Sequence, residues 1–200
     1  MAQMITPRVL AVALPLLIVL LGGCGNPLED SREQANEAIE AANASIAEHN
    51  RHFERARDTY AEVKERIEKG GDPSNQKERI AEARRNLQQA RNSLRDARES
   101  LAEVQQLDVE EDIKRYARLL SEAMDAQLAA EQKEIRFYEI LQDDPALEDR
   151  REEALDLLAE VGEGYESAEE AYGEARKLAD SNPDLIKRPT EGGGSAEGDA

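Results

Sequence analysis

Apolar residues recur at alternating steps of three and four along residues 80–104, and this spacing is the strongest constraint on the fold. The positions are Ile80, Ala83, Leu87, Ala90, Leu94, Ala97, Leu101 and Val104. Such spacing places all of these side chains on one face of an α-helix and is typical of a coiled-coil seam. Because alanine alternates with larger residues, a neighbouring helix can approach this face closely.

Comparable spacing continues on both sides of this segment, interrupted by residues that begin or end helices. Asn26-Pro27 and Asp72-Pro73 each supply a capping side chain followed by a first-turn proline, and Gly70-Gly71 favours a helix end between them. Asp144-Pro145 repeats the starting pattern, and Pro183 ends the last periodic segment. The sequence therefore predicts helices over about 27–69, 73–107, 109–142 and 145–181.

The break between the second and third predicted helices has the weakest signal. Asp108-Val109-Glu110-Glu111 has a capping-box pattern, and the heptad loses its phase after Val104, which favours a turn there. No glycine or proline marks the position. One continuous helix through both segments is therefore the alternative.

Apolar side chains of the last two predicted helices are expected to face the interior. In the third they are Ile113, Ala117, Leu120, Met124, Leu128, Ile135 and Tyr138, and in the fourth Leu147, Ala154, Leu158, Val161, Tyr165, Ala168, Tyr172 and Ala175. Gly162, Gly164 and Gly173 interrupt the fourth, where glycine costs about 1 kcal/mol relative to alanine. We expect close packing or a kink at these glycines, with a hinge as the alternative.

The expected fold class is all-α, because no alternating strand pattern occurs over residues 26–182. Short connections between long helices favour an antiparallel up-down four-helix bundle or an elongated antiparallel coiled coil. With 35% charged and 4% aromatic residues, the composition suits narrow apolar seams. We expect a helical ectodomain over residues 24–182 and a disordered tail over 183–200, which has little apolar content.

Residues 1–23 have the organisation of an export signal. Arg8 gives the start of the chain a positive charge, and residues 9–21 form an uncharged apolar run that contains Pro15. A transmembrane helix needs roughly 20 apolar residues, so this run is too short to span a bilayer. Gly22-Gly23 then supplies the small side chains that suit a signal-peptidase cleft.

Leu21-Gly22-Gly23-Cys24 resembles the lipobox of bacterial lipoproteins. The resemblance implies removal of residues 1–23 as a signal peptide, a diacylglyceryl group on the Cys24 sulfur and, in many members of the class, a further acyl chain such as palmitate on the new amino terminus. Two or more acyl chains hold a protein stably on a membrane. Cys24 is also the only cysteine, so lipidation would explain an unpaired thiol in an exported chain. An uncleaved signal anchor, or a free thiol beside an ordinary cleavage site, is the alternative.

The charge of the chain excludes some classes of partner. Arg8 is the one charged residue of the first 23, so its removal changes the net charge from −18 to −19. A surface this acidic, without a basic cluster, is not expected to bind nucleic acid or to lie on anionic lipid. The membrane is therefore expected to contact the protein only through lipidated Cys24. The net charge is −8 over residues 146–181, which we interpret as a solvated face rather than a binding surface for a basic partner.

His49 and His52 are the candidate metal ligands that the sequence suggests. They lie one helical turn apart, with His49 on the apolar seam, but two ligands do not make a site. The preferred interpretation is a seam histidine with a local hydrogen-bond partner and a solvated His52, so no metal and no cofactor is assigned. Met124 without a Cys-x-x-Cys-His motif gives no support for haem. No catalytic residue is assigned either, because the sequence lacks the motifs of nucleophilic and phosphate-binding enzymes.

These observations predict a non-enzymatic lipoprotein of the bacterial cell envelope, anchored on the extracytoplasmic side of a membrane. Its helical ectodomain is expected to act as a structural or protein-interaction module that contacts an envelope protein or forms a homo-oligomer. The alternative is a lipid-tethered bundle that binds a small ligand or metal through His49 and interior polar residues such as Gln127.

Overall fold

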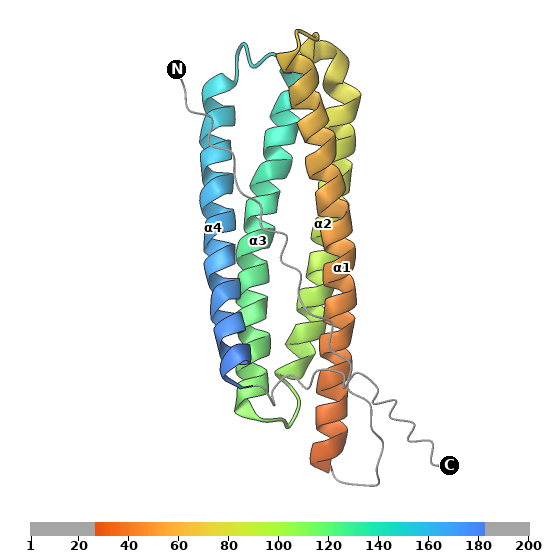
Figure 1. The fold of residues 1–200 in the computed structure, drawn as a ribbon, viewed down its shortest axis with the longest axis vertical. Helices are drawn as coiled ribbons and strands as arrows, with labels where there is room; N and C mark the ends of the chain where they lie inside the picture. Colours follow the sequence, from red (N-terminus) through yellow and green to blue (C-terminus); the bar gives the residue numbers. More distant parts are fainter. Residues whose placement is uncertain (1–26, 183–200) are drawn as a thin grey trace, which may run out of the picture.

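The computed structural model describes residues 27–182, and these form an antiparallel up-down bundle of four long helices (Figure 1). The helices are α1 (Pro27–Glu68), α2 (Lys77–Val104), α3 (Glu111–Asp143) and α4 (Arg151–Ser181), with a short 3-10 helix η1 (Pro73–Gln76) before α2. Consecutive helices pack side by side, whereas α1 and α4 lie farther apart (Figure 1). The expected all-α four-helix fold is confirmed.

The predictions for residues 1–26 and 183–200 lie outside the described part of the chain, and so does Cys24. Within residues 27–182, none of the helices has both the length and the apolar character needed to cross a bilayer.

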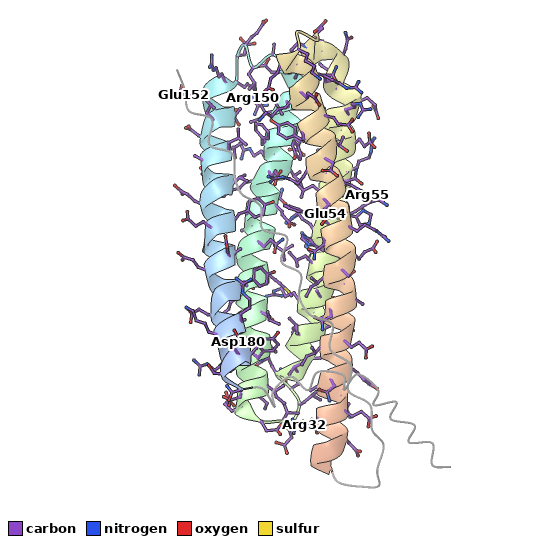
Figure 2. All side chains as sticks on the ribbon, viewed as in Figure 1. Arg32, Glu54, Arg55, Arg150, Glu152 and Asp180 are labelled. Atoms are coloured by element: carbon purple, nitrogen blue, oxygen red, sulfur yellow. The ribbon has the colours of Figure 1, made fainter. Side chains whose placement is uncertain are left out.

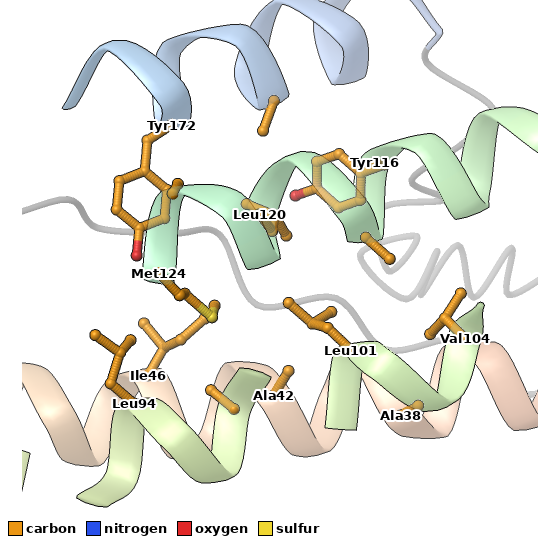
Figure 3. Packing of buried hydrophobic residues seen from close by; sticks show 14 of the residues in the cluster. Ala38, Ala42, Ile46, Leu94, Leu101, Val104, Tyr116, Leu120, Met124 and Tyr172 are labelled. Carbon is orange, nitrogen blue, oxygen red and sulfur yellow. The ribbon is translucent and has the colours of Figure 1, made fainter. Parts of the chain in front are cut away.

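The predicted seam of α2 is the best-buried surface in the bundle. All eight of its apolar side chains, from Ile80 to Val104, are at most 1% exposed. Figure 3 shows Leu101 of α2 pointing toward Leu120 of α3, within a cluster to which all four helices contribute. The alternation of alanine with larger residues therefore allows α2 to pack against both of its neighbours.

The end of α1 forms as the glycine pair predicts. Gly70 has a φ of +87°, and the Gly71 N–H donates to the Arg66 carbonyl at 2.9 Å. The Gly70 N–H donates to the Ile67 carbonyl at 2.9 Å, which completes the paired hydrogen bonds of a Schellman motif. The next helical turn begins at η1, where the Asp72 carboxylate accepts the Ser74 N–H at 2.9 Å.

The chain does break between the second and third helices, so the continuous-helix alternative is wrong. The predicted capping box does not form, because Glu110 precedes α3 without a side-chain capping bond. Gln105, Gln106 and Leu107 donate their N–H groups to carbonyls three residues earlier, which ends α2 in a tight turn at Val104 instead of residue 107.

The predicted start of the last helix at residue 145 is also wrong, because α4 begins at Arg151. The Asp144 carboxylate accepts the N–H groups of Glu148, Asp149 and Arg150 at 2.9–3.0 Å, and therefore closes a loop instead of capping a helix at Pro145. Leu147 lies in this loop with a φ of +52°, which a continuing right-handed helix cannot accommodate.

Leu158 was expected on the buried face of α4 but is 40% exposed, and Leu157 is buried instead. Both leucines fit a spacing of three and four between Ala154 and Val161, so periodicity alone could not choose between them. Leu155 is 55% exposed on the same outer surface.

Gly164 confirms the expectation of close packing, whereas Gly162 and Gly173 do not. A Cβ atom at Gly164 would lie 2.8 Å from the Ala130 Cβ, which brings α4 unusually close to α3 at this level. A Cβ atom at either of the other two glycines would meet nothing within 4 Å. These two positions therefore lack a packing reason for glycine.

We predict opposite effects of alanine at two of these glycines. Gly164→Ala should lower the free energy of unfolding, because the added methyl group forces α3 and α4 apart. Gly162→Ala is the matched control and should raise that free energy by up to about 1 kcal/mol, the usual difference between glycine and alanine in a helix. Urea denaturation of both variants measures this, and a stabilised Gly164→Ala would contradict the close approach.

Candidate functional site

The hydrophobic core consists of two clusters that follow one another along the bundle. On α1 the first cluster ends at Ile46 and the second begins at Phe53, and on α3 they are separated between Leu128 and Ile135. Polar side chains that are buried or half-buried occupy the level between the clusters. We call this set the polar layer; it consists of His49 from α1, Arg91 from α2, Gln127, Glu131 and Glu134 from α3, and Tyr165 and Tyr172 from α4.

Most charged side chains lie elsewhere, on the outside of the bundle. Figure 2 shows Glu54 and Arg55 of α1 pointing away from the other helices, and many such groups form exposed ion pairs like that between Arg98 and Asp125. Exposed pairs of this kind contribute about 0–1 kcal/mol each. The polar layer is different because its carboxylates are withdrawn from water.

Glu131 is the centre of the polar layer, with its side chain fully buried. Its Oε1 atom lies 2.7 Å from His49 Nε2, which joins α3 to α1. The Gln127 amide donates to the same Oε1 atom at 3.0 Å and lies 3.1 Å from His49 Nε2. The Tyr172 hydroxyl donates to Gln127 Oε1 at 2.9 Å, so α4 is joined to the same network.

Arg91 brings α2 into the polar layer. Its Nε donates to the Leu128 carbonyl at 3.4 Å, and the side chain is buried. Burial lowers the pKa of Arg91, the charge of Arg95 lowers it further, and the negative charge of Glu131 opposes both effects. The guanidinium and the carboxylate therefore interact electrostatically inside the bundle.

Glu134 lies one turn beyond Glu131 and is held by tyrosines. The hydroxyl groups of Tyr138 and Tyr165 donate to its two oxygen atoms at 2.8 and 2.6 Å. Burial and then the charge of Glu134 raise the pKa of both tyrosines well above 10, and the same two causes raise that of Tyr60 to about 12. These hydroxyls therefore stay protonated at neutral pH, and those of Tyr138 and Tyr165 act as stable donors to the carboxylate.

Aromatic rings close the side of the layer where α1 and α4 lie apart. The His49 ring stacks on Phe53 with centroids 5.5 Å apart, and the edge of Tyr165 meets Phe53 at 5.8 Å. The Arg57 guanidinium lies 5.7 Å from the Phe53 ring centroid. Large side chains thus bridge a distance that the backbones of α1 and α4 do not.

His49 and Gln127 lie in the interior as the sequence predicts, but His52 does not lie in open solvent. A local partner of His49, which the sequence predicts without naming a residue, is found in Asn50, whose Oδ1 lies 3.0 Å from His49 Nδ1. The closer contact of His49 is with Glu131. The His52 side chain is 14% exposed and its Nε2 lies 3.0 Å from Glu48 Oε1. The two histidines therefore contact different carboxylates and do not converge on one point.

Sequence reasoning missed Glu131 and Glu134. The apolar spacing predicted for the third helix passes from Leu128 to Ile135 without a member between them, and Glu131 occupies the vacant seam position. A carboxylate in a seam was therefore the available signal. The sequence gives no such signal for Glu134, because its burial depends on its contacts with Tyr138 and Tyr165.

Two other kinds of site come into question among the described residues: a group of metal ligands and a surface hollow. Within residues 27–182, no three His, Cys, Asp or Glu side chains are grouped so that they could hold a metal ion. A shallow hollow between α3 and α4 is lined by charged groups that pair with one another, such as Lys133 with Glu160 at 2.8 Å and Arg150 with Glu153 at 2.8 Å. The polar layer is therefore the candidate site.

No protein-family model matches the chain, and no curated protein or solved structure matches it either.

We predict that His49 and Glu131 are energetically coupled. His49→Leu alone should lower the free energy of unfolding by about 3–5 kcal/mol, because it leaves a buried carboxylate without its partner. The double variant His49→Leu/Glu131→Leu should recover most of this loss, since an apolar pair carries no desolvation penalty. His52→Leu, at a partly exposed pair, should change the value by less than about 1 kcal/mol. Urea denaturation measures all three, and additive losses in the double variant would show that the pair is not coupled.

Proposed function

We propose that this chain is a bacterial envelope lipoprotein, anchored through lipidated Cys24, whose helical bundle serves as a non-catalytic structural or protein-interaction module. The observation that carries the proposal is the lipobox-like Leu21-Gly22-Gly23-Cys24 so close to the start of α1. Only Gly25 and Asn26 separate Cys24 from Pro27, the first residue of the helix. A lipidated Cys24 would therefore hold the bundle next to the membrane surface.

The antiparallel arrangement determines which connections of an anchored bundle would lie near the membrane and which would lie far from it. The start of α1 and the connection between α2 and α3 lie at one end, and the other two connections lie at the opposite end (Figure 1). At 1.5 Å per residue, the 42 residues of α1 span about 60 Å. The loops after α1 and α3 would thus be presented about 60 Å from the lipid.

The interior supports a structural role more than a catalytic one. In the polar layer, Glu134 accepts from two tyrosines, and Gln127 bonds Glu131 and Tyr172. These side chains bond to one another across α3 and α4. An acid and a base in a common cleft, which enzymes that use carboxylates require, are not found among these contacts.

A second candidate function is a lipid-tethered bundle that binds a small ligand or a metal ion. The specific observation in its favour is the buried contact of His49 with Glu131 and Gln127 at the level between the two apolar clusters. Such polar groups in the core of a helical bundle are a common place for ligands and metals.

We predict that Cys24→Ala abolishes anchoring. Cells expressing the wild-type chain with an alkyne-bearing fatty acid should yield a labelled protein that lacks residues 1–23 and partitions with the membranes. Cys24→Ala should be unlabelled and keep its signal segment, whereas Ala44→Ser, at an exposed position of α1, should behave as the wild type. A wild-type chain that begins at Met1, carries an unmodified sulfur and stays in the soluble fraction would refute the anchor.

The interaction role predicts contacts at the end of the bundle that lies far from Cys24. A photo-crosslinking residue at Asn75, which is exposed just before α2, should repeatedly capture one envelope protein or a second copy of the chain in intact cells. Gln106, exposed in the turn at the opposite end, is the matched control and should capture less of that product. Repeated absence of any product from Asn75, identified by mass spectrometry, would count against the interaction role.

A further inference from the structure

Three polar side-chain groups converge between α1 and α3 without an apolar atom of the core clusters to separate them. The distances between His49 Nε2, Glu131 Oε1 and the Gln127 amide nitrogen are 2.7, 3.0 and 3.1 Å. Ligand atoms around a four-coordinate zinc ion, at bond lengths of about 2.0–2.1 Å, lie about 3.3 Å apart. The three distances need to lengthen by about 0.2–0.6 Å to accept an ion.

One ring nitrogen of His49, Nε2, faces an oxygen atom of the Glu131 carboxylate. If Nδ1 carries the proton and donates to Asn50 Oδ1 at 3.0 Å, the Nε2 lone pair faces Glu131 Oε1 at 2.7 Å. Two lone pairs repel at this distance, so a hydrogen atom or a metal ion must lie between them. A metal-bound histidine ordinarily donates its other N–H to an oxygen in just this way.

Glu131 has an oxygen atom that the described chain does not use. Its Oε2 is fully buried and has no hydrogen-bond partner within residues 27–182. An ionised carboxylate withdrawn from water in this state is costly, and a cation coordinated by the carboxylate compensates for the loss of water. This is independent of the geometry around His49, and it leaves Oε2 available as a ligand atom although Arg91 interacts electrostatically with the carboxylate.

Gln127 can supply a third ligand by a rotation of its amide. The nitrogen and oxygen of an amide occupy nearly the same positions after a half turn, and their assignment follows the hydrogen-bond network. After that rotation the oxygen faces His49 and Glu131, and the NH₂ group donates to the Tyr172 hydroxyl, which can accept as well as donate. Tyr172 would then orient the ligand from outside the metal shell.

We propose that the polar layer binds one divalent transition-metal ion through His49 Nε2, the Glu131 carboxylate and the Gln127 amide oxygen, with one further position for water. An imidazole, a carboxylate and an amide suit Zn²⁺, Co²⁺, Ni²⁺ or Cu²⁺. The inference deepens the second candidate function and is independent of the lipid anchor. Arg91 lies near Glu131 and is positively charged, as the metal ion is. Its repulsion of the ion therefore limits the affinity of the site.

The test uses the full chain, purified in detergent and freed of metal with a chelator. Titration with Zn²⁺ in a calorimeter should show one equivalent bound, and Co²⁺ should give the absorption bands of a low-coordinate nitrogen and oxygen site. His49→Gln and Glu131→Gln should each weaken binding more than about 100-fold, beyond the effect of changing a group outside the ligand shell. His52→Gln is the matched control and should bind as the wild type. Absence of binding in the wild type, or equal binding in His49→Gln, would overturn the proposal.

Two variants test the same site by strengthening it, in case the loss of a ligand unfolds the chain. Gln127→Glu replaces a weak amide ligand with a carboxylate, and Arg91→Gln removes the like charge, so each should tighten Zn²⁺ binding about tenfold, equivalent to 1.4 kcal/mol. Unchanged or weaker binding in Gln127→Glu would contradict the proposed ligand set. Cys24→Ala should bind Zn²⁺ as the wild type, so a failure of the anchor and a failure of the metal site give different results.

Discussion

Burial of the alanine-rich seam of α2 is the constraint on which the rest of the bundle depends. Its side chains are among the least exposed in the described chain, and α2 is the helix that packs directly against both α1 and α3. Small residues at alternate positions bring the neighbouring backbones close, and the larger residues between them fill the space that remains. The positions of α1 and α3 around α2 then determine which polar residues can meet in the interior.

The polar layer follows from that placement. His49 comes from α1 and Glu131 from α3, so their contact exists only because α2 holds both helices at one level. A shift of α1 by one heptad would move His49 into an apolar cluster and leave the buried Glu131 without its nearest partner. The desolvation of an unpaired carboxylate opposes such a shift. The layer therefore fixes the register of the helices, whether a proton or a metal ion lies between the two side chains.

The proposed anchor and the polar layer belong to separate parts of the molecule. Cys24 precedes the start of α1, whereas His49 lies more than twenty residues into that helix, about 30 Å farther along the axis. Tethering and ligand binding would thus operate independently. In the proposed orientation the polar layer lies near the middle of the bundle, away from the lipid and from the loops available to a partner.

The sequence by itself determined the all-α fold class, the end of α1 at Gly70 and the seam of α2, because each depends on local conformation and periodicity. It also placed His49 on a buried face. Only the tertiary structure decided that α4 begins at Arg151, where the Asp144 carboxylate closes a loop, and that Leu157 is buried in place of Leu158. It alone brought Glu131 to His49, 82 residues away, since periodicity indicates which face of a helix is buried but not which residue of another helix that face meets.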